Sequence, residues 1–348
     1  MDSVAVSEQP GGQPQASGLP DRPVLKHCTT RSFSDDKPML MIVGSEYFEL
    51  TEEVGSREDF LTVKRYLDGR HTISQIAARA GVDEESVRDI VATFADLDLL
   101  GKPRPMDFVP GPELVKQVED ACRMWGQQIG FHPLFSGLEA GTLRPEVLMG
   151  LLLETYHYIN SAPKHIATAI AHCRDERLLP LLSQHFVDEW DHARHLLEGL
   201  KLAGLPRAHA ETAYPVIGTW SLVNNLCEVA RQDTLSYIAA TALFEARADD
   251  YELGRESLLE AVRKAGFSEA TVEPLLTHMR LDVEANHVGL FPEAVEILGD
   301  IPAADAHRVV NNIHDLKHSF DQFHDQIVHF YSDISNHIPR SKMDFFLL

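Results

Sequence analysis

Apolar residues recur every three or four positions from about residue 111 to the end of the chain, and no strand-like alternation continues beyond about four residues. This period is typical of amphipathic helices. Prolines and glycines interrupt it repeatedly, at Pro145, Pro163, Pro180, Pro206, Pro215, Gly266 and Pro302. We therefore expect residues 111–348 to form one all-α domain of six to eight helices.

The part of the chain before this domain has a different character. Residues 1–38 are rich in Gly, Pro, Gln, Ser and Asp without apolar periodicity, which predicts a disordered leader. Residues 39–103 combine extended apolar segments with three short helical patterns, and the second helix starts after Thr72 as its cap and stops near Gly81. This order predicts a small winged helix-turn-helix module. A proline-rich linker, from Pro103 to Pro112, follows it.

The charge balance argues against nucleic acid as a partner. The chain has 53 acidic and 31 basic residues, which gives a formal net charge of −22. The helix in the recognition position begins Asp83-Glu84-Glu85, so its carboxylates would face phosphates and repel them. We interpret the module as a protein-binding or structural one.

The cysteines and the apolar runs indicate a cytoplasmic protein. The four cysteines lie far apart without a CxxC pair, which argues against a disulfide framework or a thiolate zinc site; they are Cys28, Cys122, Cys173 and Cys227. No run reaches the roughly 18 to 20 uncharged apolar residues of a membrane helix, and the first residues lack the pattern of a signal peptide. We expect no membrane partner.

Histidine is unusually frequent, with 18 residues, and imidazole is the commonest metal ligand in proteins. Three helical stretches carry histidines and carboxylates at helical spacing: Glu189 with His192, Glu245, and His278 with Asp282 followed by Glu284 and His287. Glu245 follows a run of apolar and small residues, which predicts a buried carboxylate. Carboxylates and imidazoles that converge in a helical bundle typically bind two iron or manganese ions, because the carboxylates neutralise the cations and neutral imidazoles complete their coordination.

A second ligand set has the order of a ferritin-like bundle: Glu154, Glu189, His192, Glu245, Glu284 and His287. Glu154 also stands three residues before His157, and some Glu-x-x-His pairs are expected by chance in an acidic, histidine-rich helical chain. Both sets share Glu189, His192 and Glu245.

Other polar positions carry weaker signals. One face of a C-terminal helix, predicted to be solvated, carries His314, His318, Asp321 and Asp325; a subunit contact or an adventitious metal site is the alternative. Arg247 is predicted to form a surface salt bridge, with a substrate carboxylate as the alternative partner. The segment Phe131-His132-Pro133 is predicted to be a loop without an assigned role.

From about Glu146 to Phe291 the chain resembles the heme-oxygenase-like diiron oxidases and oxygenases, relatives of the quinone-synthase and thiaminase folds. Four segments in the family's order carry the resemblance: ETYHYINSAPKHIATAI, DEWDHARHLLEGLKLAGL, ALFEARADDYELG and LLTHMRLD. The resemblance implies a mainly α, heme-oxygenase-like bundle with three histidines and three carboxylates around two iron ions, or manganese. Carried over by motif, five of these ligands are Glu189, His192, Glu245, His278 and Asp282.

The sixth position departs from the family. The family's last motif is His-x-x-x-Asp-x-x-His, but its final position is Ala285 here and His287 lies two residues later. At about 100° per residue, His278 and His287 would point to opposite sides of a regular helix. A π-bulge or a break after Asp282 would bring His287 to the site; otherwise the site has five protein ligands, or metal binding is impaired.

The N-terminal module resembles the peptide-recognition winged helices of ribosomal-peptide biosynthesis, which are related to the pyrroloquinoline-quinone chaperone. The shared pattern is an acidic-apolar strand, Asp-Gly, Thr-x-x-x-Ile-Ala and a terminal Leu-Leu. It implies that residues 39–103 hold a peptide or carrier protein by strand addition at the sheet edge and third helix. A purely structural or dimerising module is equally compatible with the pattern.

Together these features predict an enzyme, a non-haem diiron oxidase or oxygenase. It would use dioxygen to oxidise a small amino-acid-like substrate, free or linked to a peptide or carrier protein, in a biosynthetic pathway. We expect a homodimer. Three alternatives stay open: a metal-free binding protein on the same fold, a cofactorless oxidase in which histidines handle protons, and a ferritin-like diiron protein.

Overall fold

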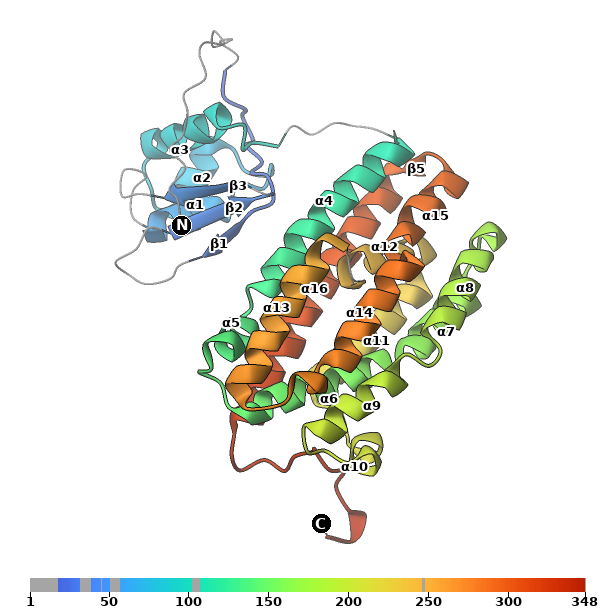
Figure 1. Ribbon diagram of the computed structural model, residues 1–348. Helices are drawn as coiled ribbons and strands as arrows, with labels where there is room; N and C mark the ends of the chain where they lie inside the picture. Colours follow the sequence, from blue (N-terminus) through green and yellow to red (C-terminus); the bar gives the residue numbers. More distant parts are fainter. Residues whose placement is uncertain are drawn as a thin grey trace. The chain divides into compact units, whose positions relative to one another are not determined.

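The computed structural model describes residues 18–31, 39–44, 46–50, 57–101, 107–245 and 248–347 (Figure 1). The chain divides into two compact units, Met1–Pro105 and Met106–Leu348. The division falls within the proline-rich linker.

The N-terminal unit combines an antiparallel sheet with three helices. The strands follow one another in the order β1 (Thr29–Arg31), β2 (Met39–Val43) and β3 (Glu46–Leu50), and the helices are α1 (Arg57–Lys64), α2 (Ile73–Ala80) and α3 (Glu84–Asp96). Met41 of β2 is fully buried in one core with Phe60 of α1, Ile76 of α2 and Val91 of α3. This arrangement is compatible with a winged helix.

Local signals account for the ends of α2. The Thr72 hydroxyl accepts a hydrogen bond from the amide of Gln75, and the Gln75 side chain accepts one from the amide of Thr72, which forms a capping box. The helix ends at Gly81, whose φ of 70° lies in the left-handed region that glycine tolerates best. The prediction of a helix between Thr72 and Gly81 is confirmed.

The predicted end of the disordered leader at residue 38 is wrong. The amide of Leu25 donates to the carbonyl of Leu67, the amide of Lys26 donates to that of Leu99, and β1 pairs with β2. Backbone hydrogen bonds of this kind leave no periodicity in a short segment, so the composition did not reveal them. Residues 1–17 and 32–38 of the predicted leader lie outside the described residues.

The second unit is helical. Across residues 107–245 and 248–347 it contains thirteen α-helices: α4 (Gly111–Gly130), α5 (Pro133–Ala140), α6 (Pro145–Ile159), α7 (Ala162–His172), α8 (Leu179–Glu189), α9 (Ala193–Leu202), α10 (Arg207–Thr212), α11 (Ile217–Gln232), α12 (Thr234–Phe244), α13 (Ala248–Ala265), α14 (Glu273–Ala285), α15 (Leu290–Leu298) and α16 (Ala303–Ser332). The predicted number, six to eight, is too low because brief interruptions split several of the helices. Two short strands also pair, β4 (Phe108–Val109) within the predicted linker and β5 (Ile301–Pro302) within the domain predicted to be wholly helical. Neither was predicted, since two residues are too few to show a period.

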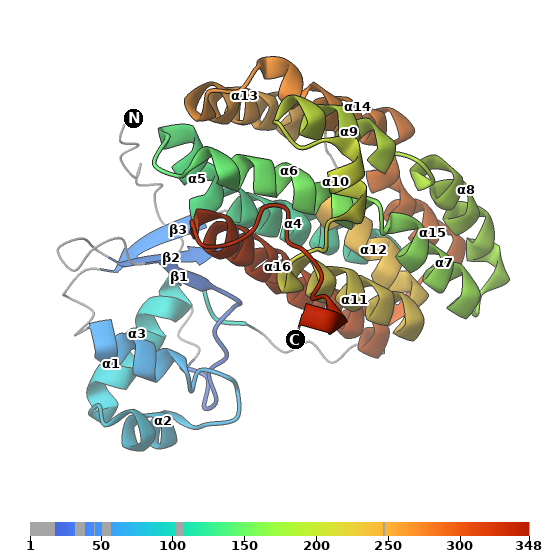
Figure 2. The same cartoon turned by 90° about the horizontal axis from the view of Figure 1, so that it is seen from below.

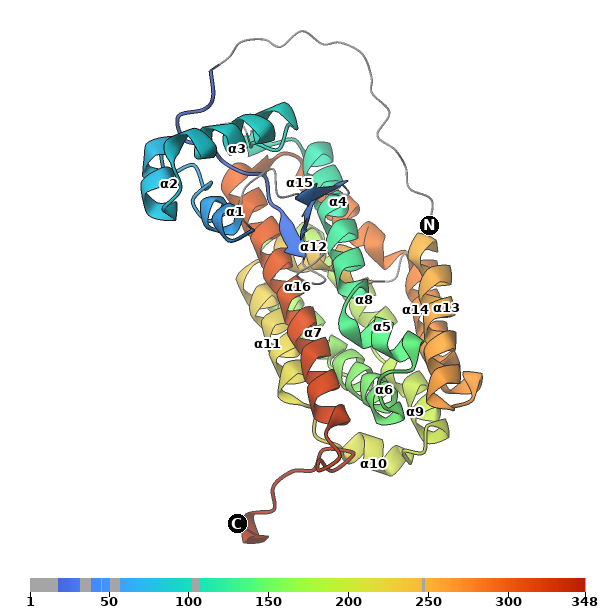
Figure 3. The same ribbon diagram turned by 90° about the vertical axis from the view of Figure 1, so that its left-hand side faces the viewer.

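The longest helix, α16, packs against α4, α6, α11 and α12 and extends along much of the bundle (Figure 3). Viewed from below, α9, α13 and α14 lie along one edge of the bundle, with α11 and α16 towards the opposite edge (Figure 2). No helix among the described residues is both long and apolar enough to span a membrane.

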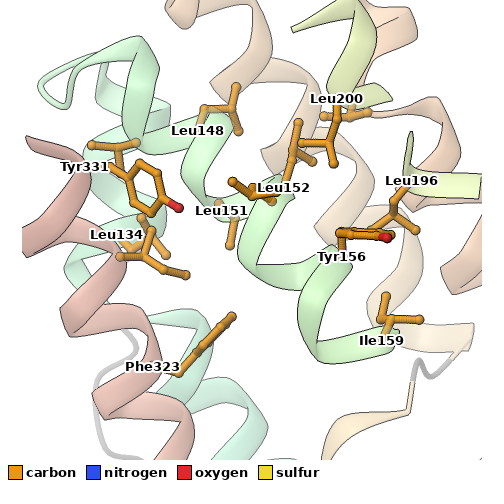
Figure 4. Packing of buried hydrophobic residues seen from close by; sticks show 14 of the residues in the cluster. Leu134, Leu148, Leu151, Leu152, Tyr156, Ile159, Leu196, Leu200, Phe323 and Tyr331 are labelled. Carbon is orange, nitrogen blue, oxygen red and sulfur yellow. The ribbon is translucent and has the colours of Figure 1, made fainter. Parts of the chain in front are cut away.

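Leucines of α6 fill the space between α9 and α16. Leu148 and Leu152 are buried and belong to one cluster with Leu196 and Leu200 of α9 and Tyr331 of α16 (Figure 4). Burying one such leucine stabilises the fold by roughly 1.5–3 kcal/mol. A second core joins α4, α7, α12 and α15; α8 packs against α7, and α14 packs against α9 and α13.

Candidate metal centre

The candidate ligands stand at or near helix ends. Glu189 is the last residue of α8, His192 is the N-cap of α9, and Glu245 is the C-cap of α12. His278 and Asp282 lie within α14, and His287 begins the short 3₁₀-helix η4 (His287–Gly289). Helix ends and the segments that follow them therefore bring several of these side chains to one place.

The structure brings all six predicted residues together. Nδ1 of His192 lies 3.0 Å from Oε1 of Glu189 and 4.0 Å from Oδ1 of Asp282. Nδ1 of His278 lies 3.1 Å from the same oxygen of Asp282. Nδ1 of His287 lies 3.2 Å from Oε2 of Glu245 and 3.4 Å from Oε1 of Glu189. Each of these contacts joins a nitrogen to a carboxylate oxygen.

A break in the helix brings His287 to the site. Helix α14 ends at Ala285, and Asn286 takes the left-handed conformation with φ 55° and ψ 42°. The chain therefore turns before His287 and does not continue around the helix. Of the alternatives that the sequence left open, the break after Asp282 is the one that the structure has.

Glu189 and His192 do not share one continuous helix, contrary to the prediction. Helix α8 ends at Glu189 and α9 begins at Ala193. The intervening residues Trp190 and Asp191 include neither proline nor glycine, so no local signal marks the interruption. The two side chains still meet, because the backbone at Trp190 and His192 keeps helical angles.

One further histidine at the site, His185 of α8, is not among the residues predicted from the sequence. Its side chain is buried, its Nε2 lies 3.9 Å from Oε1 of Glu245, and its ring centroid lies 4.7 Å from that of His287. The available signal was its position four residues before Glu189, which places both on one face of α8.

Burial and like charges set the protonation of the site. Burial raises the pKa of Glu245, and the carboxylates of Asp282 and Glu189 raise it further. Burial opposes the charged form of His287, but the hydrogen bond and charge of Glu245, together with Glu189, raise its pKa. Burial, with the neighbouring His287, lowers the pKa of His185 to about 3. Without a metal ion, protons offset part of the negative charge of the three carboxylates.

The donor set fits metal ions. Six buried atoms have no hydrogen-bond partner of suitable geometry: His185 Nδ1, Glu189 Oε1, His192 Nδ1, His278 Nδ1, Asp282 Oδ1 and His287 Nε2. Four of them, on Glu189, His192, His278 and Asp282, lie within 4.0 Å of an oppositely charged group of the site without the angles of a hydrogen bond. His185 and His287 approach Glu245 with their other ring nitrogens, Nε2 and Nδ1. Metal bonds of roughly 2.0–2.3 Å place the ligand atoms of one ion about 3–4.5 Å apart.

Three groups of ligand atoms have mutual separations within 4.8 Å: His185, Glu245 and His287; Glu189, His192 and His278; and Glu189, Glu245, Asp282 and His287. The third group shares Glu245 and His287 with the first and Glu189 with the second. Imidazole and carboxylate donors in this proportion suit iron or manganese.

The ferritin-like ligand set is wrong. Glu154 is fully buried elsewhere, where it accepts hydrogen bonds from the hydroxyls of Tyr331 (2.6 Å) and Thr219 (2.5 Å) and from the amide of Val216 (3.2 Å). Glu284 is exposed beside Arg280. The chance spacing of these glutamates, and of Glu154 with His157, mimicked a metal motif.

The C-terminal stripe has mainly structural contacts. Asp321 pairs with the buried Lys317, and the ring of His314 lies 5.2 Å from that of Trp125, so the face is only partly solvated. Asp325 lies 3.1 Å from Nε2 of His132. Nδ1 of His132 also accepts the amide of Leu134 and caps α5, which gives the segment Phe131-His132-Pro133 a structural role. Arg247 lies outside the described residues.

A cavity of about 40 Å³ adjoins the centre, lined in part by Tyr158 and His165. Nδ1 of His165 lies 2.7 Å from the hydroxyl of Tyr237. Burial, followed by the charge of Glu245, raises the pKa of Tyr158, so its phenol stays protonated. The space admits roughly three water-sized molecules.

Residues 119–249 match the model of the TENA/THI-4/PQQC family. The matched stretch includes Glu189, His192 and Glu245 and ends before His278. No curated protein matches the chain.

Among solved structures, the chain is similar to a domain of unknown function with a heme oxygenase-like fold from Shewanella denitrificans, with 15% identity, 66% of this chain and 98% of that chain covered, and a TM-score of 0.56. A TenA homologue from Pseudomonas syringae pv. tomato shares 12% identity over 66% of this chain and 98% of its own, with a TM-score of 0.48. A TenA homologue from P. horikoshii shares 13% identity over 64% and 99%, with a TM-score of 0.44. The first similarity confirms the predicted heme-oxygenase-like fold of the helical unit.

Proposed function

We propose that the helical unit binds two iron ions, or manganese, and is a non-haem diiron oxidase or oxygenase. His185, Glu245 and His287 would hold one ion, and Glu189, His192 and His278 the other, with Asp282 between them. Two divalent ions carry four positive charges against three carboxylates, so binding would remove the repulsion that protons now offset. The observation that carries this proposal is the set of buried nitrogen and oxygen atoms without hydrogen-bond partners.

Iron, when bound, supplies the electrons and open coordination positions needed to reduce dioxygen. The chain's own contribution is to exclude water and to hold protons. The ligand groups are buried, the adjoining cavity has room for a molecule the size of dioxygen, and the protonated phenol of Tyr158 lines it. The amino-acid-like substrate class rests on the family resemblance alone.

The metal-free alternatives make a different prediction. In a cofactorless oxidase or a binding protein, the same histidines would exchange protons and would not retain iron. An experiment on iron binding distinguishes the diiron proposal from the metal-free alternatives. The chain is reconstituted anaerobically with Fe(II), loosely bound metal is removed, and the iron content is measured by elemental analysis. We expect about two irons per chain and an optical band that develops on exposure to oxygen; a chain without tight iron would contradict the proposal.

A matched pair of glutamate substitutions tests the ligand assignment. Glu245→Ala removes a carboxylate of the centre whose side chain is 7% exposed, and Glu284→Ala removes an exposed one two residues beyond Asp282. We expect the first to lose at least one iron per chain and the second to retain both. Unchanged iron content in Glu245→Ala would refute the assignment even if the wild-type chain binds iron.

We propose further that the N-terminal unit recruits a peptide or carrier protein. Strand β3 has β2 as its one neighbour among the described residues, and its Tyr47 is 72% exposed, so its outer edge is available for strand addition. Peptides selected from a displayed random library against the full chain should lose binding in Tyr47→Asp. Selected peptides that bind this variant equally well would argue against the edge.

The remaining proposals concern the cellular compartment and the oligomeric state. We infer a cytoplasmic homodimer; none of the four cysteines forms a disulfide, in keeping with a reducing compartment. Light scattering of the full chain measures the oligomeric state, and a monomer would contradict that part of the proposal.

A further inference from the structure

A second cavity, of about 490 Å³, lies in the helical unit away from the metal centre. Its walls come from the junction of α6 and α7, the segment between α10 and α11, the first turns of α11, and Lys342 near the C-terminus. It shares no lining residue with the cavity beside the metal centre. Tyr158 and His165 line the metal-side cavity, whereas His157 and Lys164 line this one.

Positive charge and aromatic rings meet in this cavity. Lys164 Nζ lies 5.8 Å from the centroid of the Trp220 ring, and Lys342 Nζ lies 5.4 Å from that of Tyr214. Neither ammonium group has a carboxylate partner among the described residues. The one acidic residue of the lining, Glu211, pairs with Arg207. Two ammonium groups without carboxylate partners are notable in a chain with a net charge of −22.

Two buried nitrogen atoms of the lining residues also have no hydrogen-bond partner. They are Nε2 of His157, which is 8% exposed, and Nε1 of Trp220. Burial lowers the pKa of His157 to about 4, so the ring is neutral at pH 7 and offers one N–H and one acceptor. Both nitrogens belong to side chains of the cavity wall, and unpaired buried polar groups are costly in a folded protein.

We propose that this cavity binds a small aromatic carboxylate. The ammonium groups of Lys164 and Lys342 would pair with the carboxylate, and the rings of Trp220 and Tyr214 would contact the flat apolar body. The volume lies within the range of roughly 300–1,000 Å³ typical of small-molecule sites. This site is separate from the metal centre, and its occupancy does not depend on iron.

Fluorine NMR of the full chain labelled with 5-fluorotryptophan tests the proposal. The chain has three tryptophans, Trp125, Trp190 and Trp220, and Trp220→Phe identifies the resonance of the cavity. Indole-3-acetate is the probe. We expect a saturable shift of the Trp220 resonance, with the other two resonances unchanged as evidence that the fold is intact.

Comparison probes and variants separate the contributions of charge and ring. Tryptamine carries the same ring with a positive charge and should not shift the resonance, and inorganic phosphate alone should not shift it either. Lys164→Gln and Lys342→Gln should each weaken indole-3-acetate binding roughly tenfold. Lys116→Gln, an exposed lysine of α4 beside Asp120, should leave the binding unchanged.

Three outcomes would overturn the proposal. The first is no shift with indole-3-acetate, and the second is an equal shift with tryptamine, which would remove the role of the lysines. The third is a shift with phosphate at the same concentration, which would indicate a simple anion site without recognition of the ring.

Discussion

Nδ1 of His287 lies 3.2 Å from Oε2 of Glu245, although 42 residues separate the two along the chain. Both residues lie just beyond the end of a helix. Glu245 is the first residue after α12, and His287 is the second residue after α14. If α12 and α14 continued through these residues, the helical period would fix the direction of each side chain. The two helix ends therefore create the contact, and the site depends on where these helices stop.

Asn286 controls this contact because its left-handed backbone turns the chain towards the site. Asn286→Gly retains the conformation, whereas a residue branched at Cβ is strongly disfavoured there, and even an ordinary L residue pays roughly 1–2 kcal/mol. We expect Asn286→Gly to bind iron as the wild-type chain does and Asn286→Val to bind it roughly tenfold more weakly. Competition with a chelator measures both affinities. Equal affinities in the two variants would show that the break does not position His287.

His185 is expected to contribute to metal affinity although no family motif includes it. Its ring lies beside His287 and Glu245, and a neutral imidazole there would complete one ion. His185→Ala should weaken the binding of one of two irons by roughly 10–100-fold, the range seen when groups around a metal are removed. His172→Ala, at the exposed end of α7, is the control. Two irons of unaltered affinity in His185→Ala would assign His185 to packing alone.

Glu154 should matter for stability and not for iron. Glu154→Ala leaves the Tyr331 and Thr219 hydroxyls and the Val216 amide without their acceptor, and each unsatisfied buried group costs roughly 1–3 kcal/mol. We expect the free energy of unfolding, measured with urea, to fall by about 3 kcal/mol or more, while iron content stays at two per folded chain. Loss of iron from correctly folded Glu154→Ala would return this glutamate to the list of ligands.

The helical period and the family motifs were sufficient to predict the fold class and six of the seven residues that meet at the centre. Glu189, His192, Glu245, His278 and Asp282 converge because motif order reflects the order of packed helices. The interruptions between Glu189 and Ala193 and at Glu245 were not predictable, since neither has a proline or glycine. Tertiary packing, which a periodicity within one helix does not encode, sets these helix ends.

The N-terminal boundary and His185 were missed for different reasons. Thr29–Arg31 joins the sheet through backbone hydrogen bonds, which any side chain permits. The spacing of His185 from Glu189 could have indicated that both lie on one face of a helix. The family motif, however, begins only at Asp188 and does not include His185. Spacing also misled at Glu154, because a helical period shows which residues share a face and not what that face contacts.

Stability should fall in acid, and His324 should contribute to this fall. Its imidazole is buried beside Phe135 and Phe323, and burial, followed by the charge of His132, lowers its pKa to about 3. The unfolded chain takes up this proton near its ordinary pKa of about 6.5, and the folded chain takes it up only at much lower pH. The contribution of His324 is therefore complete above pH 6.5 and is lost as the pH falls towards 3.

From pH 7 to pH 5 this loss amounts to about 2 kcal/mol, because each pH unit between the two pKa values is worth about 1.4 kcal/mol. His324→Gln has no proton to take up, so its free energy of unfolding should fall by about 2 kcal/mol less than that of the wild-type chain over this range. Urea unfolding of the metal-free protein at both pH values measures the difference. The exposed His209→Gln should keep the wild-type pH dependence. If His324→Gln also kept the wild-type pH dependence, His324 would have to be protonated within the folded chain. Its burial among aromatic rings would then not control its charge.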